Sequence, residues 1–191
     1  MIRLFFKLCK CYKQISFENE INYFDKHMKS IKIDTLICPF CGARHTFSPF
    51  ASYNRNFVTY EDCEVHNNTL VISRYICSSC GHTHAILPSV IVPYTSFSFK
   101  FIVYLLHSYL VHEFNSVEAM CDHYCISIST FYRILSNFKV HKKLWLGLLS
   151  DKLISNLAFL QHLMNIPFIE IESFISDFFS TSGFSFFQGT S

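Results

Sequence analysis

The sequence predicts an α+β fold in which a small β-rich unit is followed by an all-helical second half. The β-rich unit covers residues 35–95. It contains two short cysteine turns, and the residues between them, Gly42–Ile76, are rich in β-branched and aromatic side chains. From Ser96 onward, apolar residues recur at steps of three and four, which is the spacing of amphipathic helices. The 191 residues, half of them apolar, give room for one medium domain or two small ones.

The predicted elements follow one another in a simple order. An amphipathic helix begins at Ser16 and ends near Lys32, within an N-terminal segment that covers residues 1–34. In the β-rich unit we expect hairpin strands at Phe57–Tyr60 and Leu70–Tyr75. We place their turn at His66–Thr69, because Asn tolerates a left-handed backbone.

The remaining elements are a short strand and then helices. The strand covers Thr83–Leu87, and a helix begins at Ser96. Residues 96–143 form one helical domain and residues 144–191 form the C-terminal helices. Within the latter, Leu144–Met164 is a long helix or a helix pair, and Phe168–Phe179 is a last amphipathic segment.

The two cysteine turns share the pattern Cys-x-x-Cys-Gly. They read Cys38-Pro39-Phe40-Cys41-Gly42 and Cys77-Ser78-Ser79-Cys80-Gly81. Cys38, Cys41, Cys77 and Cys80 together supply the four sulfurs of a tetrahedral structural Zn²⁺ site, so residues 35–95 are predicted to form a zinc ribbon. A disulfide pair or unrelated buried cysteines are the alternatives. The odd count of nine cysteines favours thiols in a reducing cytoplasm.

Other cysteine and histidine side chains have simpler explanations than a second metal site. They are Cys9, Cys11, Cys63, His66, Cys121, His123 and Cys125. Small residues at a close helix crossing explain Cys121 and Cys125 better than metal ligation. His82 or His84 could replace a cysteine as ligand, but four sulfurs are already present. We therefore expect His84 to contact the ribbon or a phosphate.

The stretch from Ser116 to Leu135 has the pattern of a helix-turn-helix. Ser116 can cap the first helix and Ser127 the second, with Cys125 at the turn, where glycine is usual. The side chains expected to face inward are Met120, Cys121, Tyr124, Phe131, Ile134 and Leu135. A plain three-helix core with a polar outer face is the alternative interpretation.

In a helix-turn-helix the outer face of the second helix enters the DNA major groove. The residues predicted for that face are Ser127, Ile128, Ser129, Thr130, Tyr132, Arg133 and Ser136. Arg133 could reach a guanine edge or a phosphate. Lys139, His141, Lys142 and Lys143 follow the helix and could neutralise backbone phosphates.

Charge and hydropathy set limits on the partners. The net charge is +2, with +3 in residues 1–90 and −3 in residues 151–191. This distribution permits nucleic-acid binding without requiring it. No stretch offers the about 20 uninterrupted apolar residues of a membrane span, so we expect a cytoplasmic protein with no membrane partner.

Three motifs resemble those of a bacterial protein family. They are Cys38-Pro-x-Cys41-Gly, the run from Arg74-x-x-Cys77-x-x-Cys80-Gly81 to Thr83-His84-Ala85-x-Leu87-Pro88, and Val92-Pro93-Tyr94. The chain resembles a domain-of-unknown-function family from low-GC Gram-positive bacteria that is sometimes labelled transposase-like. The order of ribbon and helix-turn-helix also resembles the N-terminal part of insertion-element transposases. The resemblance implies zinc binding and an association with double-stranded DNA.

The same comparison predicts that the protein is not an enzyme. Full transposases carry a large catalytic domain with three metal-binding carboxylates, and only about 50 residues follow the helix-turn-helix here. The acids in those residues are Asp151, Glu170, Glu172 and Asp177, and no strands array them for two-metal chemistry. We expect a DNA-binding protein of a mobile element or of transcription. The alternatives are a zinc-stapled interaction module, with the C-terminal helices docking a partner or second copy, and the recognition part of a split or truncated transposase.

Overall fold

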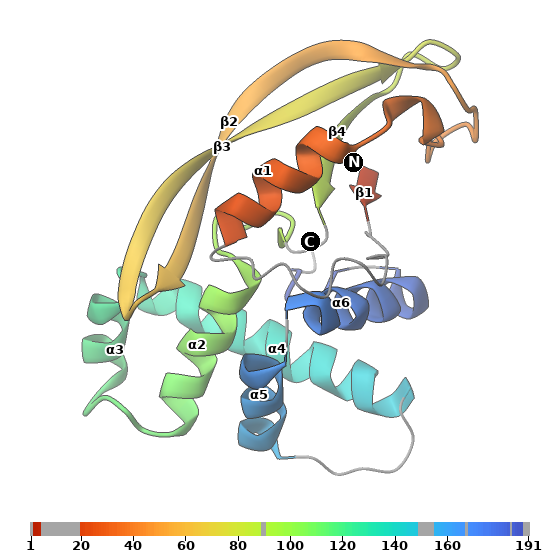
Figure 1. Ribbon diagram of the computed structural model, residues 1–191. Coiled ribbons are helices and arrows are strands. Elements are labelled where there is room, and N and C mark those ends of the chain that lie inside the picture. Colours follow the sequence, from red (N-terminus) through yellow and green to blue (C-terminus); the bar gives the residue numbers. More distant parts are fainter. Residues whose placement is uncertain are drawn as a thin grey trace. The chain divides into compact units, whose positions relative to one another are not determined.

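The computed structural model describes residues 2–4, 20–88, 91–148, 155–166, 168–183 and 185–188 (Figure 1). The chain divides into two compact units. The ribbon unit comprises Met1–Phe57 and Asn68–Ser89, and the helical unit comprises Val58–Asn67 and Val90–Ser191. The predicted α+β class is confirmed, because the strands of the first half are followed by five helices.

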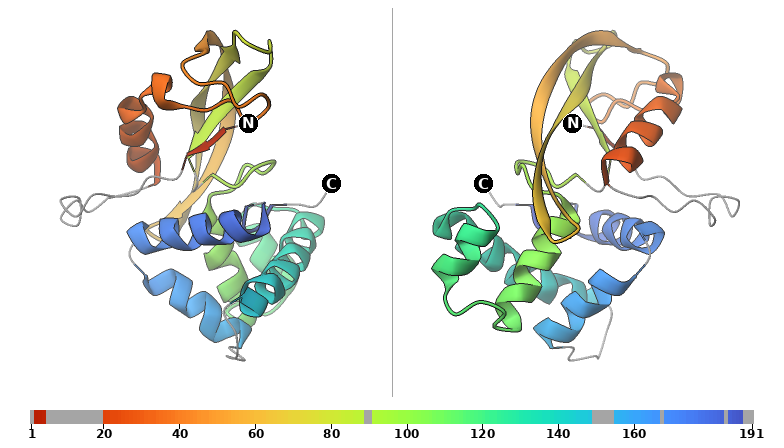
Figure 2. Two further views of the ribbon diagram at one scale, coloured as in Figure 1. Left: turned by 90° about the vertical axis from the view of Figure 1, so that its right-hand side faces the viewer. Right: turned by 60° about the vertical axis from the view of Figure 1, so that its left-hand side comes forward.

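A four-stranded sheet has the strand order β1-β4-β3-β2. The strands are β1 (Ile2–Leu4), β2 (Phe47–Glu61), β3 (Glu64–Cys77) and β4 (Thr83–Pro88). β4 runs antiparallel to β3, with His84 opposite Tyr75, and parallel to β1, with Ile86 opposite Ile2. The sequence analysis did not predict β1. Figure 2 shows the long hairpin of β2 and β3 from two sides.

The hairpin turn lies earlier than predicted. Asp62 and Cys63 connect the strands, with φ of 51° and 63°. Two consecutive residues with positive φ are the signature of a two-residue hairpin turn, whose twist matches that of the flanking strands. The predicted turn at His66–Thr69 is therefore wrong, because those residues lie inside β3. The predicted strands at Phe57–Tyr60 and Leu70–Tyr75 fall within β2 and β3 but are too short.

The ribbon unit has a small apolar core that helix α1 helps to cover. The buried side chains from the strands are Phe57, Leu70, Ile72, Ile86 and Leu87. Helix α1 (Glu20–Ser30) contacts β4 and buries Phe24. A short 3-10 turn, η2 (Ile33–Thr35), follows it. The predicted start of this helix at Ser16 lies outside the described residues.

The helical unit contains five helices in the part of the chain that the structure describes. They are α2 (Phe99–Leu110), α3 (Val117–His123), α4 (Ile128–Leu148), α5 (Asn156–Asn165) and α6 (Phe168–Ser182). Serines cap four of them, since the Oγ atoms of Ser98, Ser116, Ser127 and Ser155 each accept a backbone N–H of the first turn. No helix among the described residues is long and apolar enough to cross a membrane.

Helix α4 crosses the predicted boundary between the helical segments. It continues without a break to Leu148, so no segment begins at residue 144. The stretch Leu144–Met164 is a pair of helix portions, the end of α4 and most of α5. The predicted last segment Phe168–Phe179 is confirmed as α6.

Aromatic rings dominate the core of the helical unit. Phe186 lies with ring centroids 4.7–6.4 Å from six partners, which are Phe99, His141, Phe159, Phe174, Phe178 and Phe187. Ring pairs at these distances add stabilisation to that of the buried area. The end of the chain thus supplies the centre of the core.

His141 is held in this core as a neutral acceptor, so its predicted contact with a phosphate is wrong. Its Nδ1 accepts the backbone N–H of Phe187 at 2.8 Å, and burial lowers the pKa of His141 to about 4. An Nδ1 that accepts a hydrogen bond carries no proton, so protonation would break this bond. The folded-state pKa lies below the unfolded value of about 6.5.

The helical unit is therefore expected to lose stability as the pH falls. The contribution of His141 is complete above pH 6.5 and decreases toward pH 4, by about 1–2 kcal/mol at pH 5. The measurement is thermal unfolding at pH 7.5 and pH 5, followed by the fluorescence of Trp145, the single tryptophan. In His141→Asn the amide oxygen can still accept the N–H but does not titrate. Equal losses in this variant and the wild type would contradict the assignment.

Candidate functional site

The two cysteine turns fold into matching knuckles with the same pair of backbone hydrogen bonds. The bonds run from Cys38 N–H to Ala43 O (2.9 Å), Gly42 N–H to Cys38 O (2.8 Å), Cys77 N–H to His82 O (3.0 Å) and Gly81 N–H to Cys77 O (2.8 Å). Gly42 and Gly81 have φ of 73° and 72°. Each knuckle thus needs the glycine that follows its second cysteine, because other residues rarely adopt this conformation.

The knuckles bring four sulfurs together. The Sγ atoms of Cys38, Cys41, Cys77 and Cys80 lie within 4.8 Å of one another. Cys38 and Cys80 are 3.7 Å apart, as are Cys41 and Cys77, and the four cysteines are free thiols rather than disulfides. Bonds of about 2.3 Å in a tetrahedral thiolate site require sulfurs about 3.8 Å apart. The cluster could therefore hold a metal ion, and its spacing fits a tetrahedral one.

Two side chains outside the cysteine motifs contact the cluster. His84 on β4 is buried, and its Nε2 lies 3.5 Å from Cys38 Sγ. Thr46, just before β2, places its Oγ1 3.2 Å from Cys77 Sγ. The prediction that His84 contacts the ribbon is confirmed. Thr46 was missed, because a threonine outside the knuckles has no sequence signal.

The pKa values of the free thiols favour the binding of a cation. The Thr46 hydroxyl, as the largest influence, lowers the pKa of Cys77 to about 6. The backbone of His82 lowers the pKa of Cys80, but burial and the neighbouring sulfurs outweigh it and raise the pKa to about 12. One thiolate therefore forms readily, while its neighbours resist a second negative charge. A bound cation removes this conflict.

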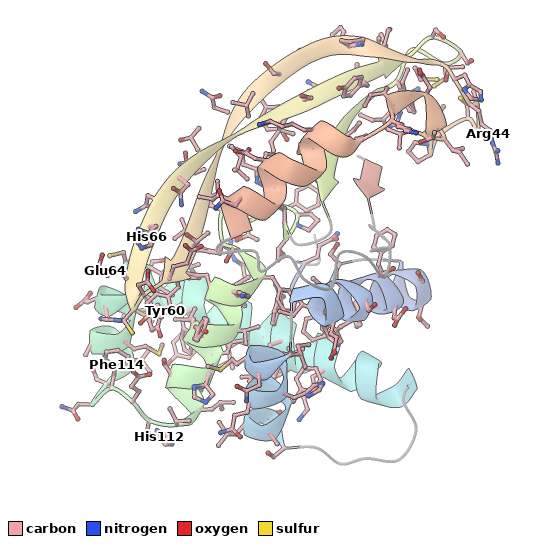
Figure 3. The ribbon with its side chains drawn as sticks, viewed as in Figure 1. Arg44, Tyr60, Glu64, His66, His112 and Phe114 are labelled. Atoms are coloured by element: carbon pink, nitrogen blue, oxygen red, sulfur yellow. The ribbon has the colours of Figure 1, made fainter. Side chains whose placement is uncertain are left out.

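An aromatic stack bridges the two knuckles. Phe40 and His82 lie with ring centroids 3.6 Å apart at an interplanar angle of 24°. His82 Nδ1 is also 3.2 Å from the backbone oxygen of Cys80. Phe40 remains largely exposed. Figure 3 shows Arg44 at the same end of the ribbon unit, with its side chain extending outward.

The other described cysteines do not join a metal-binding group. Among the described residues, the four-cysteine cluster is the one group of three or more potential ligands. Cys63 is exposed at the hairpin turn, Cys121 is buried in α3 and Cys125 is exposed in the α3–α4 connection. Cys9 and Cys11 lie outside the described residues.

Helices α3 and α4 begin where the sequence predicted and bury the predicted side chains. Ser116 caps α3, and Ser127 Oγ accepts the Thr130 N–H at 3.2 Å at the start of α4. Cys125, between the helices, has φ of 53°, the conformation for which glycine is usual. The buried side chains are Met120, Cys121, Tyr124, Phe131, Ile134 and Leu135, as predicted.

The outer face at the start of α4 is polar and accessible. Ser127, Ile128, Ser129, Tyr132, Arg133 and Ser136 are exposed, and Thr130 is half-buried. The hydroxyls of Ser127, Ser129 and Thr130 lie within hydrogen-bond distance of one another, at 3.1 Å and 2.9 Å from Ser127 Oγ. The Ser127 hydroxyl thus already takes part in hydrogen bonds at the N-terminus of α4. Arg133 and Tyr132 are the larger polar side chains on this face.

The lysines predicted to contact phosphates differ in their exposure. Lys139 is exposed. Lys142 is 8% exposed, and its Nζ donates to Asn156 Oδ1 at 2.6 Å, at the start of α5. The prediction for Lys142 is therefore wrong, because this side chain serves the packing of α4 on α5. The side chain of Lys143 lies outside the described part of the molecule.

The hairpin tip is fastened within the helical unit next to α3. Tyr60 OH lies 3.4 Å from His123 Nε2, and its ring packs on Tyr124 with centroids 5.0 Å apart. Tyr124 OH in turn contacts Ser108 Oγ at 2.7 Å on α2. Figure 3 labels Tyr60 beside α2 and α3. This contact was not predicted, because it depends on a hairpin turn at Asp62 and Cys63 rather than at His66–Thr69.

Comparison with known proteins identifies a family and no closer relative. The searches of curated proteins and of solved structures return no match. The model of one family, described as a domain of unknown function (DUF6431), matches residues 38–133, from the first cysteine of the metal cluster to Arg133 on α4. The predicted resemblance to a domain-of-unknown-function family is confirmed, whereas the resemblance to transposases stays a prediction. The matched residues are half of the chain, which therefore belongs to the DUF6431 family.

Proposed function

We propose that the protein is a zinc-stabilised DNA-binding protein in which α3 and α4 act as a helix-turn-helix. The single observation that carries the proposal is the start of α4. A run of exposed polar side chains follows a positive-φ connection and lies over a buried apolar stripe. In helix-turn-helix proteins this part of the second helix contacts base edges in the major groove.

Zn²⁺ is the metal we propose for the four-cysteine cluster. The spacing of 3.7 Å within sulfur pairs supports a tetrahedral thiolate site, which is the usual structural zinc site. Cys38, Cys41, Cys77 and Cys80 would hold the ion, and its role would be to stabilise the fold. Few of the described side chains of the ribbon unit are buried, so a bound metal would supply much of its stability.

Arg133 is the proposed reader of sequence, with Tyr132, Ser129 and Thr130 beside it. Its guanidinium can donate two hydrogen bonds to a guanine edge. Lys139 follows Arg133 on α4 and would neutralise a backbone phosphate. Lys142 has no part in this proposal, because it is buried against Asn156.

The proposed role is non-catalytic. Glu170 and Asp177, the described acids of the C-terminal segment, are exposed on the single helix α6. Two-metal phosphoryl chemistry needs carboxylates that converge on the ions. Asp151 lies outside the described residues.

Docking of a partner by the Phe-rich C-terminal tail receives less support. Phe174, Phe178, Phe186 and Phe187 are buried in the core of their own unit. Apolar side chains that already form a core do not form an exposed docking patch. The acidic exposed side of α6 is what this tail would offer to a partner or a second copy.

The test is capture of fragmented genomic DNA by the zinc-loaded protein at near-physiological salt, which suppresses non-specific phosphate binding. Enrichment of a shared motif is expected. Arg133→Ala is expected to lose about 1–3 kcal/mol of binding free energy at that motif. Arg44→Ala, which removes an exposed arginine of the ribbon unit, is the matched control. Absence of a motif, or equal effects of the two substitutions, would refute the groove-reading role of α4.

A further inference from the structure

The four sulfurs of the cluster occupy unequal positions. The first cysteine of each knuckle is buried, with 1% exposure for Cys38 and 0% for Cys77. The second cysteine of each knuckle lies outward, since Cys41 is exposed and Cys80 is half-buried. The knuckle fold itself creates this difference, so the cluster has an inner pair and an outer pair of sulfurs.

Cys38, an inner sulfur, has a histidine donor. His84 Nε2 lies 3.5 Å from Cys38 Sγ, and His84 Nδ1 is buried without a hydrogen-bond partner in the described structure. A metal-bound thiolate can only accept a hydrogen bond, so the tautomer with the proton on Nε2 satisfies this contact. The same tautomer leaves Nδ1 as an unpaired acceptor, which proteins tolerate better than an unpaired buried N–H. His84 is thus a donor to Cys38.

Cys77, the other inner sulfur, has a threonine donor. Thr46 Oγ1 lies 3.2 Å from Cys77 Sγ, and the Ser78 N–H holds the Thr46 backbone oxygen at 2.8 Å. This backbone bond fixes the residue that carries the hydroxyl. Backbone groups also contact the sulfurs, Ala43 at Cys41, His82 at Cys80, and Ser79 and Cys80 at Cys77. The inner pair therefore differs from the outer pair in its burial and in the side chains of His84 and Thr46.

We propose that Cys41 and Cys80 form a modification site for soft electrophiles, while His84 and Thr46 shield Cys38 and Cys77 from the same reaction. A hydrogen bond to a thiolate draws electron density from the sulfur and reduces its nucleophilicity, and burial denies access to the reagent. In the reaction with an alkyl halide, a sulfur lone pair attacks carbon, the S–C bond forms and the C–halogen bond breaks. The halide leaves, so no oxidant or reductant is required.

This inference rests on the proposed metal site, and the experiment tests metal binding and the order of alkylation separately. The metal content of the full chain, loaded with Zn²⁺, is measured first. The protein is then treated with limiting iodoacetamide, and mass spectrometry locates the modified cysteines by fragmentation. A protein that takes up no metal refutes the zinc proposal and this inference with it, because the expected order applies to four zinc-bound thiolates. Equal alkylation of the zinc-loaded protein refutes this inference alone. Cys41 and Cys80 are expected to react about tenfold faster than Cys38 and Cys77.

Variants test the role of the two donors. Thr46→Val removes the hydroxyl at nearly constant shape and is expected to raise alkylation of Cys77 relative to Cys38. His84→Phe keeps a ring and is expected to raise alkylation of Cys38 relative to Cys77. If His84→Phe does not fold, the alkylation ratio of Cys77 to Cys38 in Thr46→Val alone tests the role of the donors. Equal reaction at all four sulfurs in the wild type, or unchanged ratios in the folded variants, would overturn the proposal.

Discussion

Cys77→Ser is expected to abolish metal binding and to unfold the ribbon unit. Cys77 is fully buried and accepts the Thr46 hydroxyl, which lowers the pKa of its thiol to about 6. A serine hydroxyl does not ionise near neutral pH and so cannot replace a thiolate ligand. Structural zinc sites supply on the order of 10 kcal/mol to the folding of small modules. The apolar core of the ribbon unit is too small to compensate for that loss.

Three measurements check this prediction. Metal content should fall to background, and amide exchange in β4 (Thr83–Pro88) should become fast. A chelator added to the wild-type protein should reproduce both effects. Cys63→Ser, at an exposed cysteine of the hairpin turn and outside the cluster, is the matched control and should behave as wild type. Protected β4 amides in metal-free Cys77→Ser would show that the strands hold the ribbon unit without a metal.

The four-cysteine cluster could be predicted from the sequence because its geometry is local. Each knuckle is a turn within five residues, and the hydrogen bonds that shape it join neighbours such as Cys38 and Gly42. Two turns of this kind need only to meet for four sulfurs to converge. The contacts of Thr46 and Tyr60 depend instead on how distant segments pair, and no spacing in the sequence encodes them.

The hairpin shows how a local preference can mislead. Asn67 and Asn68 favour turns, yet they lie in β3, and the turn uses Asp62 and Cys63. The turn at residues 62 and 63 joins two long strands, β2 and β3, which are neighbours in the sheet and which bury Phe57 and Leu70. The gain from pairing and burial outweighs the cost of a positive φ at Cys63, about 1–2 kcal/mol for a residue other than glycine.

The exposed and buried sides of helix α4 were predicted correctly apart from Lys142. The 3.6-residue period correctly separated buried Phe131 from exposed Tyr132 and Arg133. It could not predict that α5 would pack on α4 and cover Lys142. A periodic pattern describes one helix alone, whereas exposure also depends on the helices that pack against it.

Phe186→Ala is expected to destabilise the helical unit by about 3–5 kcal/mol, the range for loss of a buried aromatic side chain. Phe186 is 1% exposed and lies against rings from α2, α4, α5 and α6. The alanine would leave a cavity among side chains that are each held by several others. The measurement is denaturant unfolding followed by the fluorescence of Trp145.

Tyr132→Ala, on the exposed face of α4, is the matched control and should cost far less, because its side chain is 51% exposed. A small effect of Phe186→Ala, equal to that of Tyr132→Ala, would show that the residues after α6 are not part of the core. A large effect would have a functional consequence as well. The rings around Phe186 include His141 of α4, so the C-terminal residues would stabilise the same helix that carries the proposed DNA-reading face.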